Sequence, residues 1–198
     1  MVKNSAVSFM SKVVKLGLVI GLTVGALYAG TYKVDASHSN IGFKVKHMMI
    51  SSVRGKFDKF SGSFEYDEKT GKLQSINGVV EVASINTENA KRDGHLKSAD
   101  FFNAEKYPNI LFVVNKIEDG KAYGKFTMRG VTKDVAFDIE KTGAITDPWG
   151  NKRVGLEISG KINRKDYGVN WNKVIETGGV VVGEDVKIDV TLEGILAK

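Results

Sequence analysis

The 198-residue sequence contains no cysteine, only two prolines and only three histidines. Without cysteine the chain can form no disulfide bond, no thiolate metal site and no lipid-modified N-terminal cysteine. It also lacks a Gly-x-Ser-x-Gly elbow and a His-x-x-x-His pair, the most recognisable signs of a serine hydrolase and of a helical zinc site. Basic residues are scattered and do not alternate with aromatic residues in any long run, so we expect no nucleic-acid partner.

The first 29 residues differ in composition from the rest of the chain. Lys3, Lys12 and Lys15 occur without any acidic residue, and the apolar run 16–27 and the small residues of "YAG" follow. This order predicts a cleaved signal peptide over residues 1–29 and one domain over residues 30–198, with the cut after Ala29 or Ala26. A membrane span needs about 20 apolar residues, so we expect no integral membrane segment in the mature protein.

Alternating apolar and polar residues recur through most of the remaining chain. The stretch "NIGFKVKH" places Ile41, Phe43, Val45 and His47 on one face, and similar stretches lie around residues 53–66, 76–84, 110–117, 122–128, 135–139, 154–162 and 186–192. Turn residues separate them in "KTGK", "EDGK" and "DPWGN". The pattern predicts an all-β fold of eight antiparallel strands, closed as a barrel or stacked as a sandwich.

The second of these strands contains a change of parity. Val53, Gly55 and Phe57 share one face, whereas Phe60 and the residues at every second position after it share the other. One extra residue near position 58 or 59 brings both sets to the same face. We therefore predict a β-bulge at that point.

Six glycines fall on the apolar faces of the predicted strands, which favours the barrel. They are either kink points of coiled strands or sites where missing side chains leave room inside, because an eight-stranded barrel is wide enough to be filled or to hold one small ligand. These glycines are Gly55, Gly62, Gly78, Gly124, Gly160 and Gly194.

The segment 86–109 interrupts the alternation and is too long for a structureless loop. We expect a short helical cover over one end of the barrel, beginning near Thr87 and turning again at Ser98. Within it, Asp93, His95 and Asp100 are the candidates for an acid–base or metal set, with His38 and His47 as further candidates for that set. The simpler interpretation is that Arg92 and Asp93 make ion-pair and capping contacts while Leu96, Phe101 and Phe102 pack inward.

Several spaced motifs resemble the YceI-like periplasmic lipid-binding proteins over nearly the whole mature chain. They are "YKVDASHSNIGFKVKH", "VRGKFDKFSGSF", "INTENAKRDGHLKSADFFNAEKYPNILF", "GKFTMRGVTKDV", "INRKDYGVNW" and "VVVGEDVKIDVTLE". The resemblance implies a lipocalin-like barrel whose apolar lumen holds a long-chain polyisoprenoid or a similar amphiphile. It also implies a periplasmic location and homodimers, and it assigns "RDGHL" to the helical cover.

The resulting hypothesis is a non-catalytic lipid carrier or store that needs no cofactor and no metal. An enzyme acting on such a lipid through Asp93, His95 and Asp100, and an interaction module with a solid core, are the alternatives. The predicted ligand-binding residues are Phe43, Val45, His47, Phe57, Phe64, Gly78, Val80, Leu96, Phe101, Phe102, Phe112, Gly124, Phe126, Ile158, Tyr167 and Trp171. Tyr167 and Trp171 could equally be core plugs.

Overall fold

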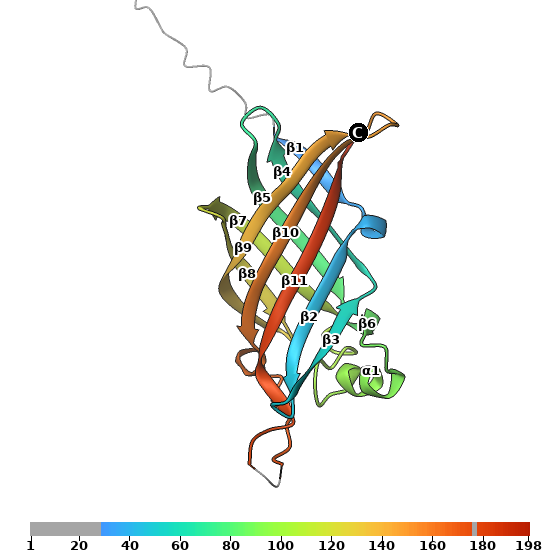
Figure 1. The fold of residues 1–198 in the computed structure, drawn as a ribbon, viewed down its shortest axis with the longest axis vertical. Helices are drawn as coiled ribbons and strands as arrows, with labels where there is room; N and C mark the ends of the chain where they lie inside the picture. The colour runs from blue at the N-terminus through green and yellow to red at the C-terminus, as the bar shows by residue number, and fades with distance from the viewer. Residues whose placement is uncertain (1–28, 176–177) are drawn as a thin grey trace, which may run out of the picture.

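The chain forms a closed antiparallel β-barrel in the computed structural model, which describes residues 29–175 and 178–198 (Figure 1). The predicted signal peptide lies outside the described residues except for position 29. The strands are β1 (Gly30–Val34), β2 (Asn40–His47), β3 (Ser51–Phe57), β4 (Phe60–Asp67), β5 (Lys72–Glu81), β6 (Ile85–Asn86), β7 (Asn109–Glu118), β8 (Lys121–Met128), β9 (Val131–Thr146), β10 (Lys152–Asn163) and β11 (Val182–Leu196).

The strands occupy eight positions around the barrel, which confirms the predicted barrel over the sandwich. β1 and β2 share one position, because both pair with β11 on the same side. β3 and β4 share the next position, where β3 pairs with β2 and β4 pairs with β1. The remaining positions belong to β5, β7, β8, β9, β10 and β11, in which each strand pairs with the next. The short β6 adds a side pairing to β3.

Short interruptions separate the two strands that share a position in the barrel, β1 from β2 and β3 from β4. The 3₁₀ helix η1 (Ala36–His38) separates β1 from β2, and its cap Asp35 accepts a hydrogen bond from the backbone N–H of Ser37. Residues 58 and 59 separate β3 from β4, where the backbone N–H of Asp58 donates to the carbonyl oxygen of Ser84. Phe57 and Phe60, on either side of this break, both face the barrel interior, so the predicted change of parity is present, but as a break between two strands and not as the predicted β-bulge within one. Strand β1 was not predicted.

Aromatic rings occupy the space beside three of the six glycines on the inner face. The rings of Phe43, Phe137 and Phe64 lie over Gly55, Gly160 and Gly194, respectively, so closely that an added Cβ would overlap them. A ring that covers a glycine fills the gap left by the absent side chain and fixes the coil of the strand. Aromatic rings therefore pack directly on these three glycines, and no free volume remains beside them.

Gly124, Gly62 and Gly78 differ in what an added side chain would meet. A Cβ on Gly124 would collide with the carbonyl oxygen of Val113, and a Cβ on Gly62 would lie 2.6 Å from the carbonyl oxygen of Asn77. At Gly78 the nearest atom is 3.9 Å away. The expectation that Gly124 opens space in the lumen is thus wrong. Gly62 and Gly78 both border the cavity, but of the six glycines only Gly78 has room for an added side chain.

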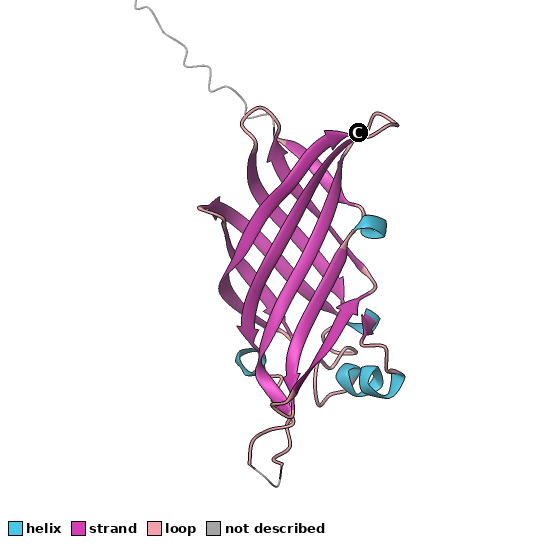
Figure 2. Cartoon of the chain, viewed as in Figure 1, coloured by secondary structure: helices cyan, strands magenta, loops and turns pink. Residues whose placement is uncertain are grey.

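The predicted helical cover is present at the lower end of the barrel in Figures 1 and 2. Helix α1 (Ala90–Lys97) begins after Asn89, whose side chain accepts a hydrogen bond from the backbone N–H of Arg92. The helix thus starts later than the predicted Thr87 because Asn89 is the capping residue. Ser98 ends the helix and starts the next turn, as predicted, by accepting from the backbone N–H of Phe101.

No helix in the described part of the chain is long and apolar enough to cross a membrane.

Candidate ligand-binding site

The barrel encloses a cavity of about 170 Å³ at the end covered by α1. Its wall is built by residues of β1–β5 and β7–β11, and the cover contributes Leu96, Phe101 and Phe102. Ser61, Asn77 and Arg164 are the polar residues that border it, and the rest of the wall is formed by apolar residues and three glycines. Such a cavity excludes water and favours an apolar guest.

Most of the predicted ligand-binding residues lie around this cavity. The eleven that line it are Phe43, Val45, Phe57, Gly78, Val80, Leu96, Phe101, Phe102, Phe112, Phe126 and Ile158. They come from strands far apart in the sequence and from the cover, which the barrel brings together. Their binding of a ligand stays a prediction.

The other five predicted residues do not line the cavity. Phe64 stacks on Tyr32 with ring centroids 5.4 Å apart and covers Gly194, away from the cavity wall. Gly124 faces the backbone of the neighbouring strand. His47 closes the end of β2, where it pairs with Val182 of β11.

The two aromatics of "DYGVNW" act as packing groups. Tyr167 is 2% exposed and meets Phe126 edge to face at 5.5 Å, so it is the core plug that the sequence left as one of two options. Trp171 lies against Phe101 at 5.1 Å and against His95 at 4.9 Å, on the side of Phe101 away from the cavity. Both side chains support the cover and its surroundings.

Several lining residues were not among the predicted site residues. Val186, Ile188 and Val190 of β11 point inward, and the alternation in "VKIDV" was enough to identify them. Val169 and Arg164 come from the irregular segment after β10, where no periodicity marks the inward side.

Arg92 and Asp93 hold the start of the cover through one buried residue, Thr87. The Arg92 guanidinium donates to the Thr87 hydroxyl and carbonyl oxygens at 2.7 Å each, and the Asp93 carboxylate accepts from the Thr87 N–H and hydroxyl. The predicted capping contacts are thus present, but they are made to Thr87 and no Arg92–Asp93 ion pair forms between these described residues.

The candidate acid–base residues of the cover are divided between two separate hydrogen-bond sets. His95 Nε2 lies 3.0 Å from Asp100 Oδ2, whereas Asp93 is bound to Thr87. None of these three candidates borders the cavity. Their arrangement stabilises the fold of the cover and brings no reactive group to an enclosed guest.

Arg164 is a charged group buried at the cavity end, with 3% of its surface exposed. Its guanidinium donates to the backbone carbonyls of Val169, Trp171, Val182 and Gly183 at 2.6–3.2 Å. Burial lowers the pKa of the guanidinium, although arginine remains protonated in proteins. Arg164 therefore pins both ends of the segment between η3 (Arg164–Tyr167) and β11.

Arg129, in the turn between β8 and β9, joins the cover to the same segment. One Nη donates to the Gly168 carbonyl oxygen and the other to the Ala99 carbonyl oxygen at 2.8 Å. The end of the cavity is thus closed by two irregular segments that one guanidinium holds together.

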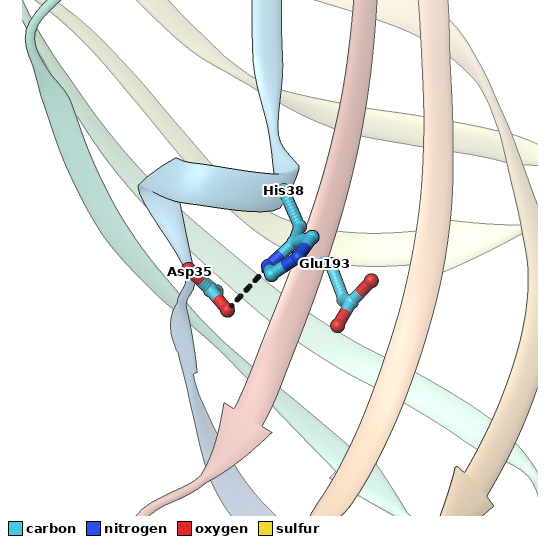
Figure 3. A group of neighbouring side chains, drawn as sticks. All are labelled: Asp35, His38 and Glu193. Atoms are coloured by element: carbon cyan, nitrogen blue, oxygen red, sulfur yellow. Dashed lines mark hydrogen bonds and ion pairs between the residues drawn. The ribbon is translucent and has the colours of Figure 1, made fainter. Parts of the chain in front are cut away.

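A cluster of Asp35, His38 and Glu193 lies on the outer side of the barrel, and Figure 3 shows these three side chains. Their candidate ligand atoms lie within 4.8 Å of one another. The Arg153 guanidinium already binds Asp35 at 3.0 Å, Asp147 at 2.7 Å and Glu193. A positive charge of the chain itself therefore occupies the place that a cation would take, and the cluster is an ion-pair network.

This network shifts the pKa values of its members. Hydrogen bonds from Ser37, His38 and Arg153 hold the pKa of Asp35 well below its usual range. Burial acts to raise the pKa of Asp147, but hydrogen bonds from Arg153 and Asn151 outweigh it and the pKa is lowered. Both carboxylates are thus stabilised in their charged form.

Comparison with known proteins agrees with this fold. The model of the YceI-like domain matches residues 32–194. A UPF0312 protein of Staphylococcus aureus (strain MSSA476) is 38% identical over 163 residues, which are 82% of this chain and 95% of the relative. The crystal structure of the Campylobacter jejuni YCEI protein superposes with a TM-score of 0.68 at 32% identity, over 83% of this chain and 96% of the other.

A more distant structure shares the fold alone. A polyisoprenoid binding domain from Saccharophagus degradans, implicated in plant cell wall breakdown, superposes with a TM-score of 0.62 at 16% identity, over 84% of this chain and 98% of that domain. The resemblance seen in the sequence motifs is confirmed by the matched domain and by the relatives above 30% identity. The chain therefore belongs to the YceI-like family.

Proposed function

We propose that the protein binds a long-chain amphiphile, with the apolar chain in the barrel cavity, and stores or carries it without changing it chemically. The observation that carries the proposal is the enclosed apolar cavity itself. Its wall has eleven of the residues expected from the sequence, and no cluster of titratable side chains borders it among the described residues. A wall of this kind recognises apolar surface and not a particular headgroup.

The size of the cavity restricts the guest. Small-molecule sites usually have volumes of about 300–1,000 Å³, whereas this cavity has about 170 Å³. It therefore suits a narrow chain rather than a wide ring system. A long chain requires the lining rings, such as Phe112 and Phe102, to turn aside as it enters.

An isoprenoid chain is the guest that we favour. The related fold from Saccharophagus degradans is described as a polyisoprenoid binding domain, which supports this choice. Burial of apolar surface contributes about 25 cal/mol for each Å² removed from water, so a chain gains affinity without specific polar contacts. We infer that selectivity among chains of similar width is low.

The periplasm is the location that we propose. The composition of residues 1–29 supports export through a cleaved signal peptide. The absence of cysteine suits a barrel held by its core in an oxidising compartment.

The test is mass spectrometry of organic extracts of the purified protein, followed by reloading of the delipidated protein with a polyprenol. We expect a copurified long-chain lipid, recovered with unchanged mass after incubation. A protein that is empty when purified and also fails to take up the polyprenol contradicts the proposal. A lipid recovered with altered mass supports the enzyme alternative instead.

A further inference from the structure

Two loops at the covered end of the barrel expose large apolar side chains to solvent. Met48 and Met49 are 41% and 60% exposed, and Ile50 and Val174 are 86% and 83% exposed. The first three form the turn between β2 and β3, and Val174 belongs to the segment before β11. We call these four residues the apolar tip.

The two loops of the apolar tip are in contact. The backbone N–H of Met48 donates to the carbonyl oxygen of Val181 at 2.9 Å, and the Met49 side chain lies beside Gly179. Both loops lie at the lower end of the barrel in Figure 1. The exposed side chains therefore form one projecting surface rather than scattered single residues.

The backbone of this turn is strained. Met48 and Met49 have φ angles of 49° and 63°, a left-handed conformation that glycine or asparagine adopts at lower cost. Strained backbone positions cluster at functional sites, so the conformation of this turn is consistent with a binding role. Methionine is adaptable in shape and suits a surface that contacts a fluid partner.

The apolar tip continues directly from the cavity wall. Val45 and Val182 line the cavity, and Val182 pairs with His47, the residue before the turn. The cavity wall and the apolar tip are thus adjacent along β2 and the start of β11.

The outer face next to the apolar tip is basic. Residues 40–57 contain four basic and no acidic residues. Lys161, Lys187, Lys44 and Arg54 lie directly opposite one another on four adjacent strands, β10, β11, β2 and β3. We call this set the basic row; at about 4.8 Å between strands it is roughly 14 Å wide.

The basic row is neutralised by the protein at only one of its four members. Lys161 binds Asp185 at 2.8 Å, but Lys187, Lys44 and Arg54 form no ion pair with any described residue. Like charges placed opposite each other on adjacent strands destabilise a sheet, and an anionic partner would relieve the repulsion among the three unpaired members of the row.

We propose that the apolar tip and the basic row dock this end of the barrel onto the surface of an anionic lipid bilayer. The apolar side chains enter the boundary between headgroups and acyl chains, and the row binds anionic headgroups as the barrel leans on its β10–β3 face. The covered end of the cavity then faces the membrane. This inference concerns the outer surface and does not depend on what the cavity holds.

The other end of the barrel also exposes apolar side chains, but without a basic row beside them. Ile145 and Trp149 are also exposed there, at 66% and 81%. Their neighbourhood contains the acidic Asp147 and the ion-paired Arg153 and no basic row. Ile145 therefore provides a matched control.

The experiment is co-sedimentation of the full mature chain with vesicles of phosphatidylcholine, alone or mixed with phosphatidylglycerol, at low and high salt. We expect binding to the anionic vesicles that weakens as salt screens the charges. The double variant Ile50→Ser with Val174→Ser should bind at least about tenfold more weakly, since each substitution removes an apolar side chain from the bilayer boundary. Lys44→Gln with Lys187→Gln should reduce binding only to anionic vesicles.

The control variant Ile145→Ser should bind within about twofold of the unmodified chain. Thermal midpoints of all variants should agree closely, because the replaced side chains are exposed or, for Lys44, only half-buried on the outer face. The inference is overturned if the unmodified chain does not bind anionic vesicles, if Ile145→Ser loses as much binding as the tip variant, or if the chain sediments equally without vesicles. If the protein binds anionic vesicles both with and without lipid in its cavity, and the tip variant loses the same share of vesicle binding in both states, the docking inference is supported independently of the cavity's content.

Discussion

Substitutions at Gly78 and Gly124 separate free volume from close packing inside the same barrel. At Gly78 the nearest atoms to an added Cβ are the Phe112 carbonyl oxygen at 3.9 Å and the Phe112 Cβ at 4.0 Å. Gly78→Ala therefore needs no movement and should raise the free energy of unfolding by up to about 1 kcal/mol, because alanine restricts the unfolded chain. Gly78→Leu places a larger apolar group in the cavity, where its burial contributes about 1.5–3 kcal/mol.

Gly124→Ala should lower the free energy of unfolding, although both glycines lie on the inner faces of strands that pair with β7. Its Cβ would collide with the Val113 carbonyl oxygen and lie 2.9 Å from the Val114 Cα. Backbone atoms of a paired strand cannot turn aside as a flexible side chain can, so the strain should cost about 1–3 kcal/mol. For a domain of this size that corresponds to a thermal midpoint lower by about 2–12 °C.

Two measurements test this reasoning: the thermal midpoint, and the amount of polyprenol bound by the delipidated protein. Gly78→Leu should stay folded and bind much less lipid, whereas Gly124→Ala should lose stability and, below its midpoint, bind normally. If Gly78→Leu unfolds as readily as Gly124→Ala, the interior is packed at that point and the cavity assignment is wrong. If Gly78→Leu binds as much lipid as the unmodified chain, the guest does not reach β5.

His95→Ala should lower the thermal midpoint by a few degrees and speed lipid exchange, because the cover loses two aromatic contacts; complete loss of binding in a folded variant would indicate a binding or catalytic role. Arg153→Gln should flatten the pH dependence of stability measured by urea unfolding. Because the pKa values of Asp35 and Asp147 are lowered in the folded protein, their contribution to the free energy of unfolding is complete above the ordinary aspartate pKa of about 3.9 and is lost as the pH falls below it. Arg153 is a cause of both shifts. Mass analysis of the exported protein should find an N-terminus near Gly30; a retained leader found with the membranes contradicts cleavage.

Local patterns in the sequence predicted the barrel strands because each pattern depends on residues close together in the chain. The change of parity between Phe57 and Phe60 located the break between β3 and β4 for this reason. Strand β1 has five residues, of which only Tyr32 is buried, and it follows directly on the apolar leader. Its alternation, with Thr31 and Lys33 exposed on either side of Tyr32, is too short to stand out beside the leader, and its pairing with β4 and β11 makes it a strand.

The parts of the candidate site that the sequence could not identify depend on contacts between residues that are far apart in the chain. Gly194 and Gly78 look alike in sequence, but Phe64 reaches across from β4 to fill the space beside Gly194. Arg164 follows a strand and has the appearance of an exposed charge, yet two carbonyls of the segment before β11 and two at the start of β11 enclose it. Only the assembled tertiary structure distinguishes these cases.

The closure of the barrel by β11 restricts the order in which the chain can fold. This last strand pairs with β10 on one side and with both β1 and β2 on the other, so the first and last strands form the same seam. A ribosome releases the N-terminal strands first, and their open edges stay without a partner until the final 15-residue strand is complete. Contacts of such long sequence separation form slowly. Synthesis and barrel closure are therefore separated in time, and a nascent chain must keep that edge from pairing with other nascent chains until its last residues are free.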